Sequence, residues 1–272
     1  MRYCFYSWLS NLMGVARNNG DRLIIASMLG ASAVGYYDIA QRILVQVYNV
    51  TSRAFGYLFP YASRMYEQGD MKKLREIYDR ATAIISVISV AMILPLFVYS
   101  HDILRIWLGE DAAVQAGLLM QILAVRFALY PLSIVNTYFL YGSNKVKAFA
   151  WVQAVSTVFM LLAIAFFTHR YGLIGAGIGQ CCVIFVILFN RAYIENAVFG
   201  SWRLLIHVFA IFAVLLPLLF SPLLGNFEVT GLVHLCLAFV ACSAFGGLCC
   251  STILVCLNRV QQRMVRSSAI GI

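Results

Sequence analysis

The 272-residue sequence contains few charged residues. Only 11% of its positions are Asp, Glu, Lys or Arg, which is less than half of the roughly 25% found in soluble domains. Hydrophobic residues make up 62% of the chain and the mean hydropathy is +0.84. A soluble fold of this length cannot bury so many apolar side chains. The same figures exclude collagen-like, disordered and disulfide-scaffold proteins, so the composition predicts an integral membrane protein.

Motifs for catalysis and metal binding are also lacking. The sequence offers no Ser–His–Asp set, no zinc-ligand spacing, no phosphate-binding loop and no paired catalytic carboxylates. The eight cysteines lie almost entirely in apolar runs, without metal-ligand spacing to His, so we expect them to be small packing residues. Basic residues are not interleaved with aromatics, which argues against nucleic acid as a partner. We therefore predict neither enzyme activity nor a cofactor.

Eight apolar runs are long enough to be membrane-spanning helices, which need about 20 residues each. The runs cover roughly residues 5–30, 34–59, 81–99, 112–140, 146–167, 172–194, 204–225 and 231–256. Ten-residue alternating patterns are absent, so the fold class is all-α and not a barrel. The first run continues to Gly30 without a small-residue cleavage site, which argues against a signal peptide.

The basic residues between the runs predict the orientation. Thirteen would lie on one side of the membrane, and only Arg105 and Arg170 on the other. The thirteen are Arg2, Arg64, Lys72, Lys73, Arg75, Arg80, Lys145, Lys147, Arg191, Arg203, Arg259, Arg263 and Arg266. By the positive-inside rule, both termini are expected in the cytoplasm. The net charge of +9 is therefore first of all a topology signal.

Two connections have the pattern of interfacial helices. In residues 61–80, Met71, Leu74, Ile77 and Tyr78 recur at helical spacing with charges between them, which predicts an amphipathic helix on the cytoplasmic side. Residues 102–111 resemble a shorter interfacial piece on the outer side, with Trp107 at the level of the lipid headgroups.

Seven charged residues fall inside predicted spans. They are Arg17, Asp21, Arg22, Asp38, Arg42, Arg53 and Arg126. Each costs about 2.5–3.5 kcal/mol at a bilayer centre, so they imply a polar interior. At 100° per residue, three helices then carry narrow polar stripes that predict the lining of a water-filled cavity. The stripes are Asp38, Arg42, Asn49 and Arg53; Arg126, Tyr130, Ser133 and Thr137; and Asn11, Asn18 and Arg22.

The depth of these charges suggests pairings. A short turn near Ala31–Ser32 would bring Arg22 and Arg42 to about the same level, so an Asp21–Arg42 pair is plausible. Asp38 with Arg42, and Arg17 with Asp21, are also spaced i,i+4 and could be purely structural pairs. Arg126 has no acidic residue in its own span and is the better candidate for contacting a ligand, whereas Arg53 could simply snorkel to the interface.

Two further local features predict helix geometry. Pro131 frees the carbonyl of Phe127 and should break or kink the fourth span next to Arg126. Gly175 and Gly179 form a GxxxG pattern, which is most simply a close contact between helices. An excess of arginine over acid in the cavity favours an anionic ligand such as phosphate or pyrophosphate.

Several segments resemble the polysaccharide flippase family, the O-antigen (Wzx-type) translocases of a superfamily that also includes drug antiporters. They read DRLIIASMLGASAVGYYDIAQRI (21–43), LFPYASRMYEQGDMKKLREIYDRA (58–81), ILRIWLG (103–109) and GLIGAGIG (172–179). The resemblance implies movement of an undecaprenyl-pyrophosphate-linked oligosaccharide between the leaflets of the bacterial inner membrane, in a cavity between two six-helix lobes. Substrate contacts are then expected from Arg126, Arg42, Arg22 and Tyr130, and coupling or charge pairing from Asp21, Asp38 and Arg17.

Length sets the domain prediction. Members of the family usually have twelve to fourteen spans, and residues 21–43 resemble their seventh and eighth helices. We therefore expect residues 1–200 to be one six-span lobe and residues 201–272 to be two accessory helices with a basic tail. The chain would be a truncated form, or part of an assembly in which a missing half or a second copy completes the transporter. Besides lipid-linked oligosaccharide and membrane lipid, the polymerase machinery is a conceivable partner.

Other functions stay open at this stage. A drug or small-molecule antiporter of the same superfamily would predict a more acidic cavity. A membrane enzyme of glycan assembly would usually carry a large outer loop or a His/Asp pair, and the longest outer connection here has about a dozen residues (100–111). A non-functional or scaffold membrane fragment is the third alternative.

Overall fold

The computed structural model describes residues 2–142 and 146–197, and in these ranges the chain is almost entirely α-helical, without strands. The helices are α1 (Arg2–Leu29), α2 (Ala31–Ala54), α3 (Leu58–Glu67), α4 (Met71–Val98), α5 (Ser100–Leu108), α6 (Glu110–Leu129), α7 (Leu132–Gly142), α8 (Val146–Cys181) and α9 (Val183–Ala197). The predicted spans at 204–225 and 231–256, and with them the accessory region 201–272, lie outside the described residues.

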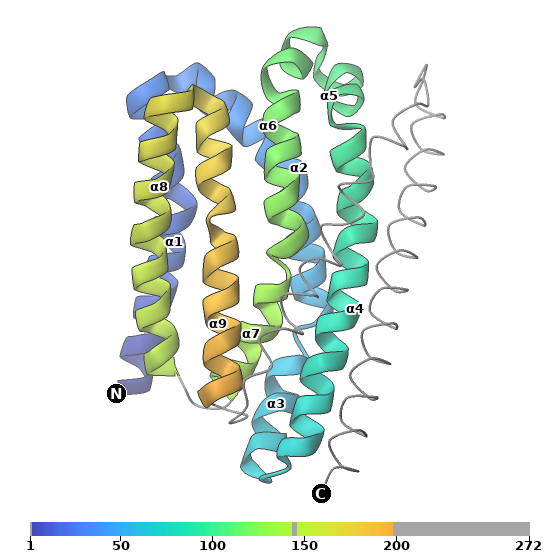
Figure 1. Cartoon of the computed structure of the whole chain (residues 1–272), viewed down its shortest axis with the longest axis vertical. Helices are drawn as coiled ribbons and strands as arrows, with labels where there is room; N and C mark the ends of the chain where they lie inside the picture. Colours follow the sequence, from blue (N-terminus) through green and yellow to red (C-terminus); the bar gives the residue numbers. More distant parts are fainter. Residues whose placement is uncertain (1, 143–145, 198–272) are drawn as a thin grey trace, which may run out of the picture.

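The long helices run side by side and are connected at alternating ends (Figure 1). One end holds the α1–α2 turn, α5 and the bend inside α8. The other end holds the start of α1, the helix α3 and the end of α9. This alternation matches the order of the six runs predicted between residues 5 and 194.

Glycine and proline divide the helices. Gly30 adopts φ 85° between α1 and α2, and Gly172 adopts φ 60° inside α8, so the two limbs of α8 fold back as a hairpin. α6 ends at Leu129, and α7 begins at Leu132 just after Pro131. The predicted break beside Arg126 is therefore confirmed.

The predicted amphipathic segment 61–80 is not one helix. α3 ends at Glu67, Gly69 takes φ 72°, and α4 starts anew at Met71. The Asp70 carboxylate accepts a hydrogen bond from the Lys73 backbone N–H (3.1 Å) and caps the new helix. Residues 71–80 are consequently the first turns of a long apolar helix. Of the outer piece at 102–111, residues 102–108 belong to α5, and Trp107 is exposed.

Three described stretches are long and apolar enough to cross a membrane: Met71–Val98, Glu110–Gly142 and Phe149–Arg191, the last of which contains the bend at Gly172. Large apolar side chains on the outer faces are exposed, among them Trp151, Phe159 and Phe166 of α8 and Phe185 of α9. A surface of this kind suits contact with lipid. The protein is a polytopic, all-α membrane protein.

The limbs of the α8 hairpin touch through glycines. A Cβ added to Gly175 would overlap the Phe167 carbonyl, and one added to Gly179 would lie 2.6 Å from the Cα of Ile164. Only glycine fits at such a distance from backbone atoms, so the close contact predicted from the GxxxG pattern is confirmed.

Candidate functional site

The hairpin of α1 and α2 brings Arg22 to Asp38. Their side chains form an ion pair, with the Arg22 Nε 2.8 Å from the Asp38 Oδ1, and both are partly exposed. The two residues are each eight positions from Gly30, where the chain reverses. The predicted pairing of Asp21 with Arg42 is therefore wrong. The turn lies about two residues earlier than the predicted one, which moves the opposite position by four residues, or one helical turn.

Asp21 is buried (1% exposed) in a polar network that joins three helices. The Tyr37 hydroxyl of α2 donates to one carboxylate oxygen (2.6 Å), and the Gln180 amide of α8 donates to the same oxygen (2.8 Å). The other oxygen accepts the backbone N–H of Arg22 (2.8 Å). Buried carboxylates need such donors because an unsatisfied charge is costly at low dielectric constant. Asp21 thus holds α1, α2 and α8 in register.

Arg17 bonds to α8 and not to Asp21, contrary to the i,i+4 alternative. Its buried guanidinium Nη2 donates to Gln153 (2.9 Å), Ser156 (3.1 Å) and Thr157 (3.1 Å). Three neutral acceptors on consecutive turns disperse the positive charge inside the protein. Arg17 is therefore a tie between α1 and α8.

Arg126 is buried in the last turn of α6 (3% exposed). Its guanidinium carbon lies 4.7 Å from the ring centroid of Phe127 and 5.1 Å from that of Tyr130, in cation–π range. Its Nε and Nη1 have no hydrogen-bond partner among the described residues. Arg126 and Asp21 carry opposite charges, and both side chains are buried inside the bundle.

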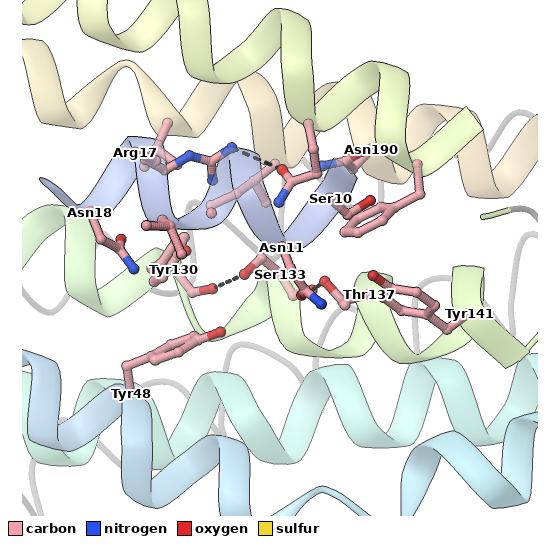
Figure 2. Close-up of a pocket in the computed structure, with 16 residues that line it drawn as sticks. Ser10, Asn11, Arg17, Asn18, Tyr48, Tyr130, Ser133, Thr137, Tyr141 and Asn190 are labelled. Atoms are coloured by element: carbon pink, nitrogen blue, oxygen red, sulfur yellow. Dashed lines mark hydrogen bonds between the residues drawn. The ribbon is translucent and has the colours of Figure 1, made fainter. Parts of the chain in front are cut away.

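A polar cavity of about 520 Å³ lies between these helices (Figure 2). Figure 2 shows side chains from α1, α2, α7 and α9 converging on it. The polar lining consists of Ser10, Asn11, Arg17, Asn18, Tyr48, Tyr130, Ser133, Thr137, Tyr141, Gln153 and Asn190. The predicted stripes contribute Asn11 and Asn18 from the first span, and Tyr130, Ser133 and Thr137 from the fourth.

Only part of the predicted site lines this cavity. Arg17 and Tyr130 do so, whereas Arg22, Arg42 and Arg126 do not. The Tyr130 ring packs against that of Tyr48, with centroids 4.7 Å apart. The predicted site residues thus do not lie together. Among the described residues that line the cavity, Arg17 is the one that carries a positive charge.

Sequence reasoning missed the contributions of α8 and α9. Gln153 and Asn190 line the cavity. In the sequence, each of them stands out only as an isolated amide within an apolar run. Arg191 was expected in a cytoplasmic loop, but it is 1% exposed inside the bundle. Its Nη2 donates to the Thr82 hydroxyl (2.9 Å), and its guanidinium lies over the Tyr78 ring at 5.5 Å. Arg191 is therefore a packing residue that ties α9 to α4.

The charged stripe of α2 faces outward. Arg42 and Arg53 are exposed and Asp38 and Asn49 are half-buried. Arg42 makes no ion pair or hydrogen bond with another described residue, so the predicted i,i+4 pair with Asp38 does not form there. An exposed, unpaired charge is costly to place against lipid, so we expect this face of α2 to meet water, protein or ligand.

Comparison with known proteins finds a family model and two relatives that match part of this chain. A family model described as polysaccharide biosynthesis protein matches residues 1–113. The chain is 22% identical over 178 residues to a Shigella flexneri protein named "Putative O-antigen transporter"; the match covers 65% of this chain and 42% of the relative. It is also 22% identical over 166 residues to the amylovoran biosynthesis protein AmsL of Erwinia amylovora, covering 61% of this chain and 42% of that relative. The chain thus matches less than half the length of either relative.

Proposed function

We propose, from its similarity to an O-antigen transporter and to polysaccharide biosynthesis proteins, that the chain is a flippase that moves a lipid-linked oligosaccharide across the bacterial inner membrane. The substrate would be an undecaprenyl-pyrophosphate-linked unit of a surface polysaccharide. The names of both relatives, an O-antigen transporter and an amylovoran biosynthesis protein, support a role in surface glycan export. The all-helical membrane fold suits a carrier, whose work is binding and conformational change.

The exposed face of α2 carries this proposal. Arg42 presents an unpaired guanidinium on a helix of the bundle, and the Arg22–Asp38 ion pair lies one turn away. A guanidinium recognises pyrophosphate through two parallel hydrogen bonds, which an ammonium cannot make. We assign pyrophosphate contact to Arg42 first, and to Arg22 when it exchanges Asp38 for the ligand.

Arg126 has a different role in this scheme. It is buried and stacks on Tyr130, and its charge is opposite to that of buried Asp21. A change in the hydrogen bonds of Asp21 would alter the electrostatic environment of Arg126. The Tyr130 ring, which stacks on Arg126 at the edge of the cavity, would then shift. We propose that Asp21 and Arg126 form the coupling element, with Tyr37 and Gln180 holding the carboxylate in one state.

The membrane orientation is part of the proposal. The end of the bundle at α3 carries Arg64 of α3 and Lys72 and Lys73 at the start of α4, whereas the opposite end carries Arg105 and Arg170. This asymmetry favours a cytoplasmic position for the α3 end. The charged face of α2 would then line an aqueous path shared with a second protein surface, from another part of the transporter or from a second copy.

The test uses substitutions introduced at the native chromosomal locus. Arg42→Ala should reduce long-chain surface polysaccharide on gels, and Arg42→Lys should restore it only partly because an ammonium lacks the planar fork. Arg80→Ala is the matched control, since Arg80 is an exposed arginine of α4 paired with Glu76. Membrane levels of each variant are compared by immunoblot.

Three results would contradict the proposal. Wild-type glycan in the Arg42→Ala strain would remove Arg42 from the substrate path. Normal glycan in a strain deleted for the gene would exclude the substrate. Drug sensitivity with normal glycan in that deletion strain would instead indicate the antiporter.

A further inference from the structure

The residues that line the cavity of Figure 2 differ in chemistry from the pyrophosphate contact proposed at Arg42. Its polar lining is made of amides and hydroxyls, with one arginine and no carboxylate or lysine among the described residues. Tyr48, Tyr130, Tyr141 and Phe149 add aromatic rings. The volume of about 520 Å³ lies within the range of small-molecule sites. Such a lining suits a ligand that is rich in hydroxyl groups and carries little charge.

Asn190 points to a missing ligand most directly. Its side chain is 5% exposed and lines the cavity, and its Oδ1 has no hydrogen-bond partner among the described residues. Unpartnered buried amide oxygens are rare in folded proteins, because each one forfeits the hydrogen bond it would make in water. A hydroxyl donor in the cavity would satisfy this oxygen.

The hydroxyls of α7 are also set to accept. Ser133 donates its hydrogen to the Tyr130 carbonyl (2.7 Å), and Thr137 donates its hydrogen to the Ser133 carbonyl (2.8 Å). Each hydroxyl has one hydrogen, so the lone pairs of both oxygens stay available to a donor. The amides of Asn11 and Asn18 add both donors and acceptors on the α1 side.

Arg17 does not turn the cavity into a phosphate site. Its Nη2 already donates to Gln153, Ser156 and Thr157. A guanidinium bound in this way cannot offer that nitrogen as part of a fork for an anion. Its Nε, which has no partner among the described residues, can still donate one hydrogen bond to a neutral oxygen.

We propose that this cavity binds a neutral sugar ring, a hexose or an N-acetylhexosamine, within the helical bundle and apart from the pyrophosphate contact at Arg42. Asn190, Ser133 and Thr137 accept from sugar hydroxyls, and Asn11 and Asn18 donate to ring substituents. The inference rests on the proposed function for its biological meaning, since a glycan carrier would use the pocket to hold one sugar of its cargo.

The test is direct binding to the purified full chain in nanodiscs prepared without glycoside detergents. Saturation-transfer NMR is recorded with N-acetyl-D-glucosamine and D-galactose, and with glycerol as a small polyol control. Thr137→Val keeps the shape of the side chain and removes the acceptor. Thr51→Val is its matched control, because Thr51 also donates to a carbonyl of its own helix (Val47, 2.8 Å) but does not line the cavity.

We expect at least one sugar to bind saturably and glycerol not to bind. Thr137→Val should weaken sugar binding about three- to tenfold, as expected for one hydrogen bond, and Asn190→Leu at least as much. Thr51→Val should bind as wild type. A circular-dichroism melt shows whether each variant is folded. If Asn190→Leu does not fold, Thr137→Val still provides the test.

The inference would be overturned if neither sugar bound saturably, or if wild type, Thr137→Val and Asn190→Leu bound with equal affinity. Displacement of the sugar by inorganic pyrophosphate at similar concentration would also overturn it, by showing an anion site. The proposed function is tested separately by glycan export from the deletion strain. Loss of export there, with no sugar binding in vitro, would refute the pocket and leave the transport proposal standing.

Discussion

Gly179 offers a sharp test of the close packing in α8. An alanine there would place a Cβ 2.6 Å from the Cα and 2.8 Å from the N of Ile164. Both are backbone atoms and cannot rotate away. Carbon atoms in contact are about 3.5–4.0 Å apart, so the two limbs of the hairpin would have to separate by about 1 Å.

The expected loss of stability follows from two opposing effects. Overpacking of this kind costs about 1–3 kcal/mol. Replacing a glycine by alanine within a helix returns about 0.5–1 kcal/mol. The net effect of Gly179→Ala should be a loss of about 1–2 kcal/mol, which lowers the folded-to-unfolded ratio by about 5- to 30-fold. The neighbouring Gln180 would move with it, so the hydrogen bonds to Asp21 and Tyr37 should weaken too.

Gly35→Ala is the matched control for this substitution. Gly35 lies inside α2, its φ is not positive, and an added Cβ would meet no heavy atom within 4 Å. It should leave stability unchanged or raise it by up to about 1 kcal/mol. Equilibrium unfolding of the purified chain in detergent, followed by circular dichroism, compares the two variants. If Gly179→Ala were as stable as Gly35→Ala, the two limbs of α8 would not pack through this glycine.

Two other substitutions examine the polar contacts. Tyr37→Phe should destabilise the protein by about 1–3 kcal/mol, because it removes the hydroxyl that donates to buried Asp21; Tyr36→Phe, on the same helix but half-buried, should change stability by less than half as much in the same unfolding assay. A double-mutant cycle of Arg22→Ala and Asp38→Ala should give a coupling energy below about 1 kcal/mol, because both side chains are more than a third exposed; a coupling above 2 kcal/mol would show that this pair is shielded from water.

Local sequence features predicted the helical skeleton well. The lengths of the apolar runs, Pro131 and the glycines of residues 172–179 each act within a few residues, so their effects can be judged without the rest of the chain. The same reasoning failed at residues 61–80. There, Gly69 and Asp70 end one helix and start another, and the apolar spacing of Met71, Leu74, Ile77 and Tyr78 lies in the second helix alone.

Partners of the buried charges could not be predicted in this way. Arg17 bonds to residues 136 to 140 positions further along the chain, and Asp21 bonds to Gln180, 159 positions away. Helical angles place a side chain on a face, but they do not say which helix covers that face. A turn displaced by two residues was enough to exchange Arg42 for Asp38 opposite Arg22.

Apolar length, charge asymmetry and helix-breaking residues therefore suffice to make this chain a polytopic helical membrane protein with charges inside its bundle. Which charges become structural ties, which stay exposed, and which amides enclose a cavity depend on the packing of helices distant in sequence. Packing decides these points because a hydrogen bond requires atoms within about 3 Å, and such distances arise only when α8 and α9 close against α1, α2 and α7.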